Sequence, residues 1–175
     1  MPRINVLPKN IADLIAAGEV VERPSSVIKE FVENSIDAGA TNIVVEIKNG
    51  GKTYIRVTDN GCGIDREDVK KAFISHATSK ITIAEDLYEV TSLGFRGEAL
   101  ASIAAVSHVE LLTKEKEALT GKRVTVSGGK ISESEEVACP NGTTFIINSW
   151  AIYFNPPALT DAPLTSDYVA IGKWK

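Results

Sequence analysis

A change of hydrophobic period near residue 40 constrains the fold of this chain more than any other feature of its sequence. Residues 24–38 carry apolar side chains at helical spacing, and a proline and a glycine suit the first turn and the left-handed stop of that helix. From residue 42 the apolar side chains alternate, which is typical of a strand. Residues 49–51 (Asn-Gly-Gly) predict a hairpin turn into a second alternating strand over 54–58.

The rest of the chain adds helices and further strands of the same kind. Helices are predicted over residues 10–17, from Asp65 through Phe73, and from Gly97 to Val106, and strands over 108–113, 122–127 and 143–148. This order predicts an α/β (α+β) two-layer sandwich, in which a mixed, mostly antiparallel sheet carries helices on one face.

Composition narrows the class of protein. A hydrophobic content of 43% fills a real core, and a net charge of −4 argues against a broad nucleic-acid surface on this chain. Cys62 and Cys139 lack metal-ligand spacing, so we expect reduced thiols rather than a metal site or a disulfide. The chain shows neither a signal peptide nor an apolar stretch long enough to span a bilayer.

Asp59 is the most informative single residue. It is in phase with Ile55 and Val57, so the strand directs its carboxylate toward the core. Burial of an unpaired carboxylate costs several kcal/mol, so a donor must bond to it, and a purine amino group is a suitable one. Gly61 and Gly63 let the backbone approach a flat ring closely. The alternative is that Asp59 only caps the Asp-Asn-Gly turn.

Glu30 and Asn34 lie one helical turn apart on the polar side of the helix at 24–38. A glutamate there can take a proton from an attacking water, and an amide oxygen can hold Mg²⁺, which completes its shell with water and phosphate oxygens. The alternative is a solvated polar face, which is the more common role of such residues.

Two further segments suit phosphate. Residues 94–98 open a helix, whose free N–H groups favour an anion, and residues 76–80 offer hydroxyl and ammonium groups. An ordinary glycine turn and a plain surface loop are the alternatives. Residues 50–53 (Gly-Gly-Lys-Thr) resemble the end of a phosphate loop, but Glu46 stands where that loop needs glycine, and a strand follows instead of a helix.

Taken in order, these strings resemble the signature blocks of the MutL family of DNA mismatch-repair proteins. The matching strings are residues 11–24 (IADLIAAGEVVERP), 32–40 (VENSIDAGA), 59–64 (DNGCGI), 76–80 (HATSK) and 93–103 (LGFRGEALASI). The wider GHKL superfamily includes gyrases, heat-shock chaperones and histidine kinases. The resemblance implies a Bergerat-type ATP-binding fold.

The resemblance also implies a role for each matching residue. Glu30 would be the general base, Asn34 the Mg²⁺ ligand, and Asp59 the acceptor for the adenine amino group, with Gly63 and Thr143 beside the base. A lid over the phosphates of ATP would comprise Thr78, Ser79, Lys80, Gly94, Phe95, Arg96 and Gly97.

In function, the resemblance implies an ATPase that works slowly, as a switch, and forms a homodimer of its N-terminal region when ATP binds. The implied partners are a MutS-type mismatch sensor, DNA contacted mainly through the full-length protein, and a downstream nuclease or helicase. The implied location is cytoplasmic, or nuclear in a eukaryote. The alternative is a nucleotide-binding module with negligible turnover, because the family's second, lysine-supplying domain is absent from this sequence.

The resemblance weakens after Asn148. Residues 152–159 only partly match a block of the family, and this chain has Leu159 where that block has an arginine. We therefore expect an ATPase domain over residues 1–148 and a divergent or truncated tail over 149–175, at the start of a second domain.

Overall fold

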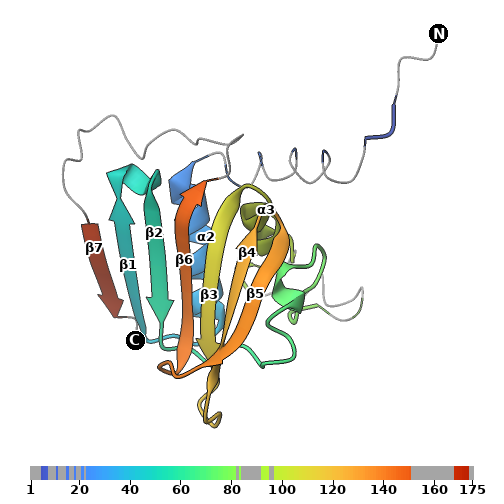
Figure 1. Cartoon of the computed structure of the whole chain (residues 1–175). Helices are drawn as coiled ribbons and strands as arrows, with labels where there is room; N and C mark the ends of the chain where they lie inside the picture. Colours follow the sequence, from blue (N-terminus) through green and yellow to red (C-terminus); the bar gives the residue numbers. More distant parts are fainter. Residues whose placement is uncertain are drawn as a thin grey trace.

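A seven-stranded antiparallel sheet with helices on one face forms the body of the molecule (Figure 1). The computed structural model describes residues 5–7, 11, 15, 18, 21, 23–81, 83, 92–94 and 97–150, and the backbone of 168–173. The strands are β1 (Asn42–Lys48), β2 (Tyr54–Asp59), β3 (Ser107–Lys114), β4 (Gly121–Ser127), β5 (Lys130–Val137), β6 (Gly142–Trp150) and β7 (Tyr168–Lys173).

The strand order is β5-β4-β3-β6-β2-β1-β7. All pairings of the described strands are antiparallel, so the predicted two-layer sandwich is confirmed and its sheet has no parallel pair in this part of the chain. The first two strands pair directly, with Val45 opposite Val57, as the predicted hairpin requires. Helices α2 (Pro24–Asp37) and α3 (Ala99–Ala105) lie behind the sheet in Figure 1.

Helix α2 forms as the sequence predicts. Pro24 occupies its first turn, Ala38 is its C-cap, and Gly39 follows. Val27, Phe31 and Ser35 are buried on its inner side, whereas Ile36 is 37% exposed. The Phe31 ring stacks on Phe145 of β6 with centroids 4.6 Å apart, and this contact fixes the helix against the middle of the sheet.

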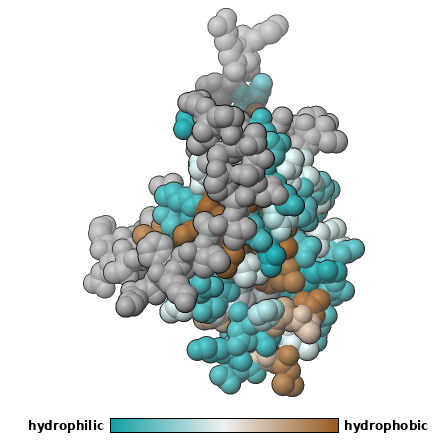
Figure 2. Space-filling model, turned by 90° about the vertical axis from the view of Figure 1, so that its left-hand side faces the viewer, coloured by the Kyte–Doolittle hydropathy of each residue, from teal (hydrophilic) through white to brown (hydrophobic). Residues whose placement is uncertain are grey.

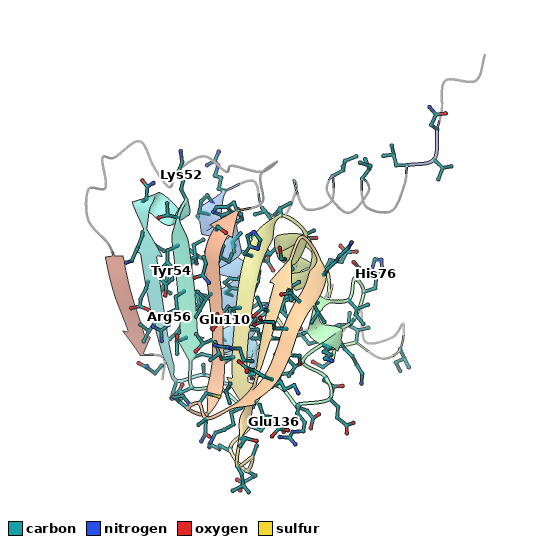
Figure 3. All side chains as sticks on the ribbon, in the orientation of Figure 1. Lys52, Tyr54, Arg56, His76, Glu110 and Glu136 are labelled. Atoms are coloured by element: carbon teal, nitrogen blue, oxygen red, sulfur yellow. The ribbon has the colours of Figure 1, made fainter. Side chains whose placement is uncertain are left out.

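The hydrophobic core lies between the helices and the sheet. It is built by the alternate residues of the central strands together with α2 and α3, and its largest fully buried side chains are Phe31, Ile55, Ile103, Leu111 and Ile147. The opposite face of the sheet is mixed in character, and Arg56 and Glu110 project from it (Figure 3). Figure 2 shows the molecule from the side that lies on the left in Figure 1, where hydrophilic residues cover much of the described surface and hydrophobic residues occupy smaller areas between them.

Two helix predictions need correction. The segment 65–73 forms turns and a single 3-10 turn, Lys71–Phe73, instead of a regular helix. Asp65 does cap this segment, since its Oδ1 accepts the Glu67 N–H at 2.7 Å. Helix α3 begins only at Ala99, because Gly97 has φ +63 and cannot be its first residue. The predicted helix over 10–17 falls largely outside the described residues.

Two strands were absent from the sequence prediction. β5 pairs with β4 at an edge of the sheet, and its sequence, KISESEEV, is too polar to show an apolar alternation. β7 lies within the expected tail and pairs with β1, with Ala170 opposite Val45. The boundary after Asn148 itself stays a prediction. Among the helices that the structure describes, none is long and apolar enough to cross a membrane.

Candidate functional site

A cavity of about 810 Å³ lies between α2, the end of β2, the segment around residues 61–80, residues 93–94 and 97–98, and the start of α3. Every predicted site residue that the structure describes lines it: Glu30, Asn34, Asp59, Gly63, Thr78, Ser79, Lys80, Gly94, Gly97 and Thr143. Phe95 and Arg96, the two remaining predicted residues, lie outside the described part of the chain. The sequence blocks, which are scattered over more than 110 residues, therefore meet at one place.

Asp59 ends β2 and points inward with only 5% of its surface exposed. Its Oδ1 accepts the N–H groups of Gly61 at 2.9 Å and Thr143 at 3.1 Å, and its Oδ2 lies 2.9 Å from the Ser35 hydroxyl. Asp59 thus caps its own turn and also faces the cavity, so the two roles are compatible. The two N–H groups and the Ser35 hydroxyl, whose one proton also lies within reach of the Phe31 carbonyl at 2.9 Å, offset the cost of burial. Oδ2 retains room for one further donor, since a carboxylate oxygen accepts about two hydrogen bonds.

Two threonine hydroxyls form a hydrogen-bond network next to Asp59 at this end of the cavity. The Thr113 and Thr143 hydroxyls lie 3.1 Å apart, and Thr113 Oγ1 also accepts the Ile64 N–H at 2.9 Å. Thr113 can donate to the Gly142 carbonyl at 3.2 Å. The network ties β3, β6 and the turn after β2 together, so the walls around Asp59 are held by the sheet.

Close contacts with neighbouring backbone explain why Gly63 and Gly142 lack a side chain. A Cβ on Gly63 would lie 2.4 Å from the Lys114 carbonyl oxygen, and a Cβ on Gly142 would lie 2.2 Å from the Asp59 carbonyl oxygen. Both residues also have positive φ, +77° and +103°. The close neighbour that requires glycine at position 63 is therefore the backbone of Lys114, and not the flat ring that the sequence suggested. Gly63 still lines the cavity next to Asp59.

The polar side of α2 forms another wall of the cavity. Glu30, Asn34 and Asp37 follow one another at helical spacing and all line the cavity, so the polar face of α2 borders the cavity, while the roles of Glu30 and Asn34 stay predictions. Glu30 is partly buried. Asn34 Oδ1 accepts a hydrogen bond from Lys80 Nζ at 3.3 Å, which places a cation at the amide oxygen predicted to hold Mg²⁺.

Asp37 connects α2 to both phosphate-side segments. Its carboxylate pairs with Lys80 and accepts the N–H groups of Leu93 at 3.0 Å and Gly94 at 3.1 Å. Burial alone would raise the pKa of the Asp37 carboxyl, but the Lys80 hydrogen bond, the two N–H groups and the Lys80 charge together hold that pKa below its ordinary value. Asp37 is therefore ionised at neutral pH.

The two predicted lid segments contact each other. The His76 N–H donates to the Gly97 carbonyl at 2.9 Å, and a Cβ on Gly97 would lie 2.4 Å from the Ala77 carbonyl oxygen. His76 Nδ1 also lies 3.0 Å from a Glu98 carboxylate oxygen. Residues 76–80, 93–94 and 97–98 thus form one wall of the cavity.

The donor set fits a metal ion that is shared with a nucleotide. The described residues contain no group of three His, Cys, Asp or Glu side chains that could hold an ion unaided. Asn34 Oδ1 would supply a single amide oxygen to such an ion, and the Lys80 ammonium now donates to that atom at 3.3 Å. Mg²⁺ commonly takes one or two protein ligands and completes its shell with water and phosphate oxygens, which is the arrangement that this wall allows.

The sequence did not predict three contacts of the site. These are the bond of Ser35 to Asp59, the bonds of Asp37 to the segments around residues 80 and 93–94, and the bonds of Thr113. A serine at position 35 lies four residues after Phe31, on the buried side of the helix, and this polar residue in an apolar stripe was a usable signal. Asp37 lies three residues after Asn34 and so shares its face. Nothing in the sequence marked Thr113.

Comparisons with known proteins agree with this geometry. Residues 22–152 match the sequence model of the family described as histidine kinase-, DNA gyrase B-, and HSP90-like ATPase. The chain belongs to this ATPase family.

Within it, the predicted resemblance to MutL proteins is confirmed. The chain is 58% identical to the DNA mismatch repair protein MutL of Agathobacter rectalis over 158 residues, which are 90% of this chain and 24% of that protein. It is 55% identical to MutL of Caldanaerobacter subterraneus subsp. tengcongensis, over 90% of this chain and 26% of that protein. The chain thus spans about a quarter of the length of these relatives.

Solved structures show the same likeness. The Aquifex aeolicus MutL ATPase domain complexed with ADP superimposes with a TM-score of 0.56 and 34% identity, covering 77% of this chain and 45% of that one. The N-terminal domain of a DNA repair protein superimposes with a TM-score of 0.64 and 28% identity, covering 79% of this chain and 39% of that one.

Proposed function

We propose that this chain binds ATP in the cavity and hydrolyses it slowly, as a nucleotide-dependent switch of DNA mismatch repair. The observation that carries the proposal is the inward Asp59 carboxylate, which has three protein donors and a remaining lone pair, at one end of a cavity whose other end holds Asn34 and Lys80. An acceptor fixed in this way suits the adenine amino group, and the cation-bearing end suits the phosphates.

The residues of the chain would divide the reaction among themselves. Asp59 orients the base, with Thr143 and Gly63 beside it, and Glu30 accepts the proton of the attacking water. Asn34 would hold Mg²⁺, which when bound neutralises phosphate charge. Thr78, Ser79, Lys80, Gly94 and Gly97 would enclose the phosphates together with Phe95 and Arg96.

For the whole protein, we propose that nucleotide binding joins two such domains and couples a MutS-type mismatch sensor to a downstream nuclease or helicase. The support is the similarity to proteins named as MutL. Contacts with DNA would lie mainly outside this chain, which has a net charge of −4.

A second candidate is a nucleotide-binding module with negligible turnover. One contact favours it, since Lys80 already donates to Asn34 Oδ1, the atom that the metal needs. An oxygen bonded to an ammonium group must exchange that partner before it can bind Mg²⁺.

Single-turnover cleavage of ATP by Glu30→Gln tests the proposal. We expect the rate of phosphate release to fall about 10²–10⁴-fold, the usual loss for a general base, while ATP affinity changes less than about threefold. Glu46→Gln, which removes a carboxylate from the far face of the sheet, is the control. Loss of ATP binding in Glu30→Gln would refute its role as base. Binding without measurable release by the unchanged chain would favour the second candidate.

A further inference from the structure

Asp37 is the point at which two irregular segments are tied to α2. Its partners Lys80, Leu93 and Gly94 lie 43, 56 and 57 residues further along the chain. The Asp37 side chain is 10% exposed and that of Lys80 is 22% exposed, so neither charge is freely solvated. One carboxylate thus fixes the backbone of one segment and the ammonium group of the other.

The position of Asp37 in its helix is unfavourable for helix stability. It is the last residue of α2, which has no basic residue in its last turn. A negative charge at a helix C-terminus opposes the helix dipole and so destabilises the helix. Its bonds to the two segments offset this cost, so the role of the carboxylate lies in those contacts rather than in the helix.

The contacts also place a cation where phosphates would enter. Lys80 Nζ bonds to Asn34 Oδ1 as well as to Asp37, and Gly94 lies so near that a Cβ on it would be 3.4 Å from Asn34 Oδ1 and 3.6 Å from Lys80 Nζ. Loss of the Asp37 charge would leave the ammonium half-buried beside an amide alone, which is costly. The ammonium group and the Gly94 backbone would then lose their common support.

We propose that Asp37 is a positioning residue for the phosphate groups of the nucleotide, because its carboxylate docks Lys80 and the Leu93–Gly94 backbone against the Asn34 end of α2. This inference rests on the proposed function, since it assumes that phosphates bind at this end. It adds that the phosphate end is built around a part-buried ion pair, which acts on phosphate binding and not on base binding.

The test combines two measurements on the whole chain, with Asp37→Ala, Asp37→Asn and the control Glu46→Gln. Site-resolved amide hydrogen exchange without nucleotide reports the docking directly. We expect Leu93 and Gly94 to exchange at least about tenfold faster in Asp37→Ala, because one hydrogen bond of about 1.4 kcal/mol corresponds to a factor of ten. Asp37→Asn keeps an acceptor oxygen but no charge, so its Leu93 amide should stay closer to the unsubstituted chain.

Calorimetric affinities for adenosine and for the non-hydrolysable analogue AMPPNP with Mg²⁺ form the second measurement. We expect both Asp37 variants to bind AMPPNP about tenfold more weakly and adenosine within about twofold. A general loss of folding would lower the affinities for both ligands equally, and this result would overturn the inference. Unchanged amide exchange at Leu93 and Gly94 would overturn it too. If the unsubstituted chain bound neither ligand, both the proposed function and the inference about Asp37 would fail. If the unsubstituted chain bound both ligands and the Asp37 variants lost affinity for both equally, only the inference about Asp37 would be refuted.

Discussion

The two ends of the cavity are built in different ways. At the Asp59 end, the carboxylate, the threonine hydroxyls and the close glycine contacts all belong to adjacent strands or to the turn directly after one. At the Asp37 end, the contacts join a helix to irregular segments that are more than 40 residues away in sequence.

This difference fits a division of the proposed function into recognition of the base and response to the phosphates. Strands paired on both sides hold an acceptor with little freedom, which suits recognition of a flat base. Segments held by one ion pair and a few backbone bonds can be released at a smaller free-energy cost, which suits a phosphate-sensing lid. The first end should therefore tolerate little change, and the second should respond to changes of charge.

Gly142→Ala should produce the largest effect, because it forces a methyl group against the Asp59 backbone. The added Cβ would lie 2.2 Å from the Asp59 carbonyl oxygen at φ +103°. Backbone strain and overpacking each cost about 1–3 kcal/mol, so we expect the free energy of unfolding to fall by about 4 kcal/mol in urea denaturation.

Gly128→Ala is the matched control for that change. It also has positive φ, +54°, but no atom lies within 4 Å of the added Cβ. We expect a loss of about 1–2 kcal/mol from the left-handed backbone alone. Equal losses in the two variants would show that the Asp59 end is not built by close backbone contact.

Asp59→Asn should have the next largest effect, this time on ligand choice. The amide oxygen can still accept the Gly61 and Thr143 N–H groups, but an NH₂ group replaces Oδ2, where the adenine amino group would donate. We expect ATP affinity measured by calorimetry to fall about 10²-fold, the loss of a charge-assisted hydrogen bond.

Binding of inosine triphosphate sharpens this prediction. Its base has a carbonyl oxygen at position six, which accepts a hydrogen bond, whereas the amino group of adenine at that position donates one. We expect Asp59→Asn to bind inosine triphosphate at least as well as the unsubstituted chain does. If ATP and inosine triphosphate lost affinity in parallel, Asp59 would act on the fold and not on the base.

Ser35→Ala should have the smallest effect of the three. It removes one donor from Asp59 Oδ2, so we expect a loss of about 1 kcal/mol in the free energy of unfolding and a few-fold loss of adenosine affinity. Ser107→Ala removes a buried hydroxyl bonded to the Ile103 carbonyl, away from the cavity. The control should lose similar stability but no affinity, and an affinity loss in both variants would count against a direct role of Ser35.

The same contrast explains what the sequence could predict. The direction of Asp59 follows from strand alternation, and the shared face of Glu30 and Asn34 follows from helical spacing, because both are local periodicities. The partners of Asp37 could not be predicted, since they depend on how long irregular segments fold back. β5 escaped prediction because its polar edge sequence has no apolar alternation, and the segment after Asp65 ended in a single 3-10 turn despite its cap.

A crystal structure of this chain with AMPPNP and Mg²⁺ would test the account most directly. The account predicts that the adenine amino group lies about 2.9 Å from the Asp59 carboxylate, a normal hydrogen-bond distance, with the phosphates between Asn34 and the Gly94 backbone. A base bound elsewhere, with Asp59 bonded only to Gly61, Thr143 and Ser35, would contradict it.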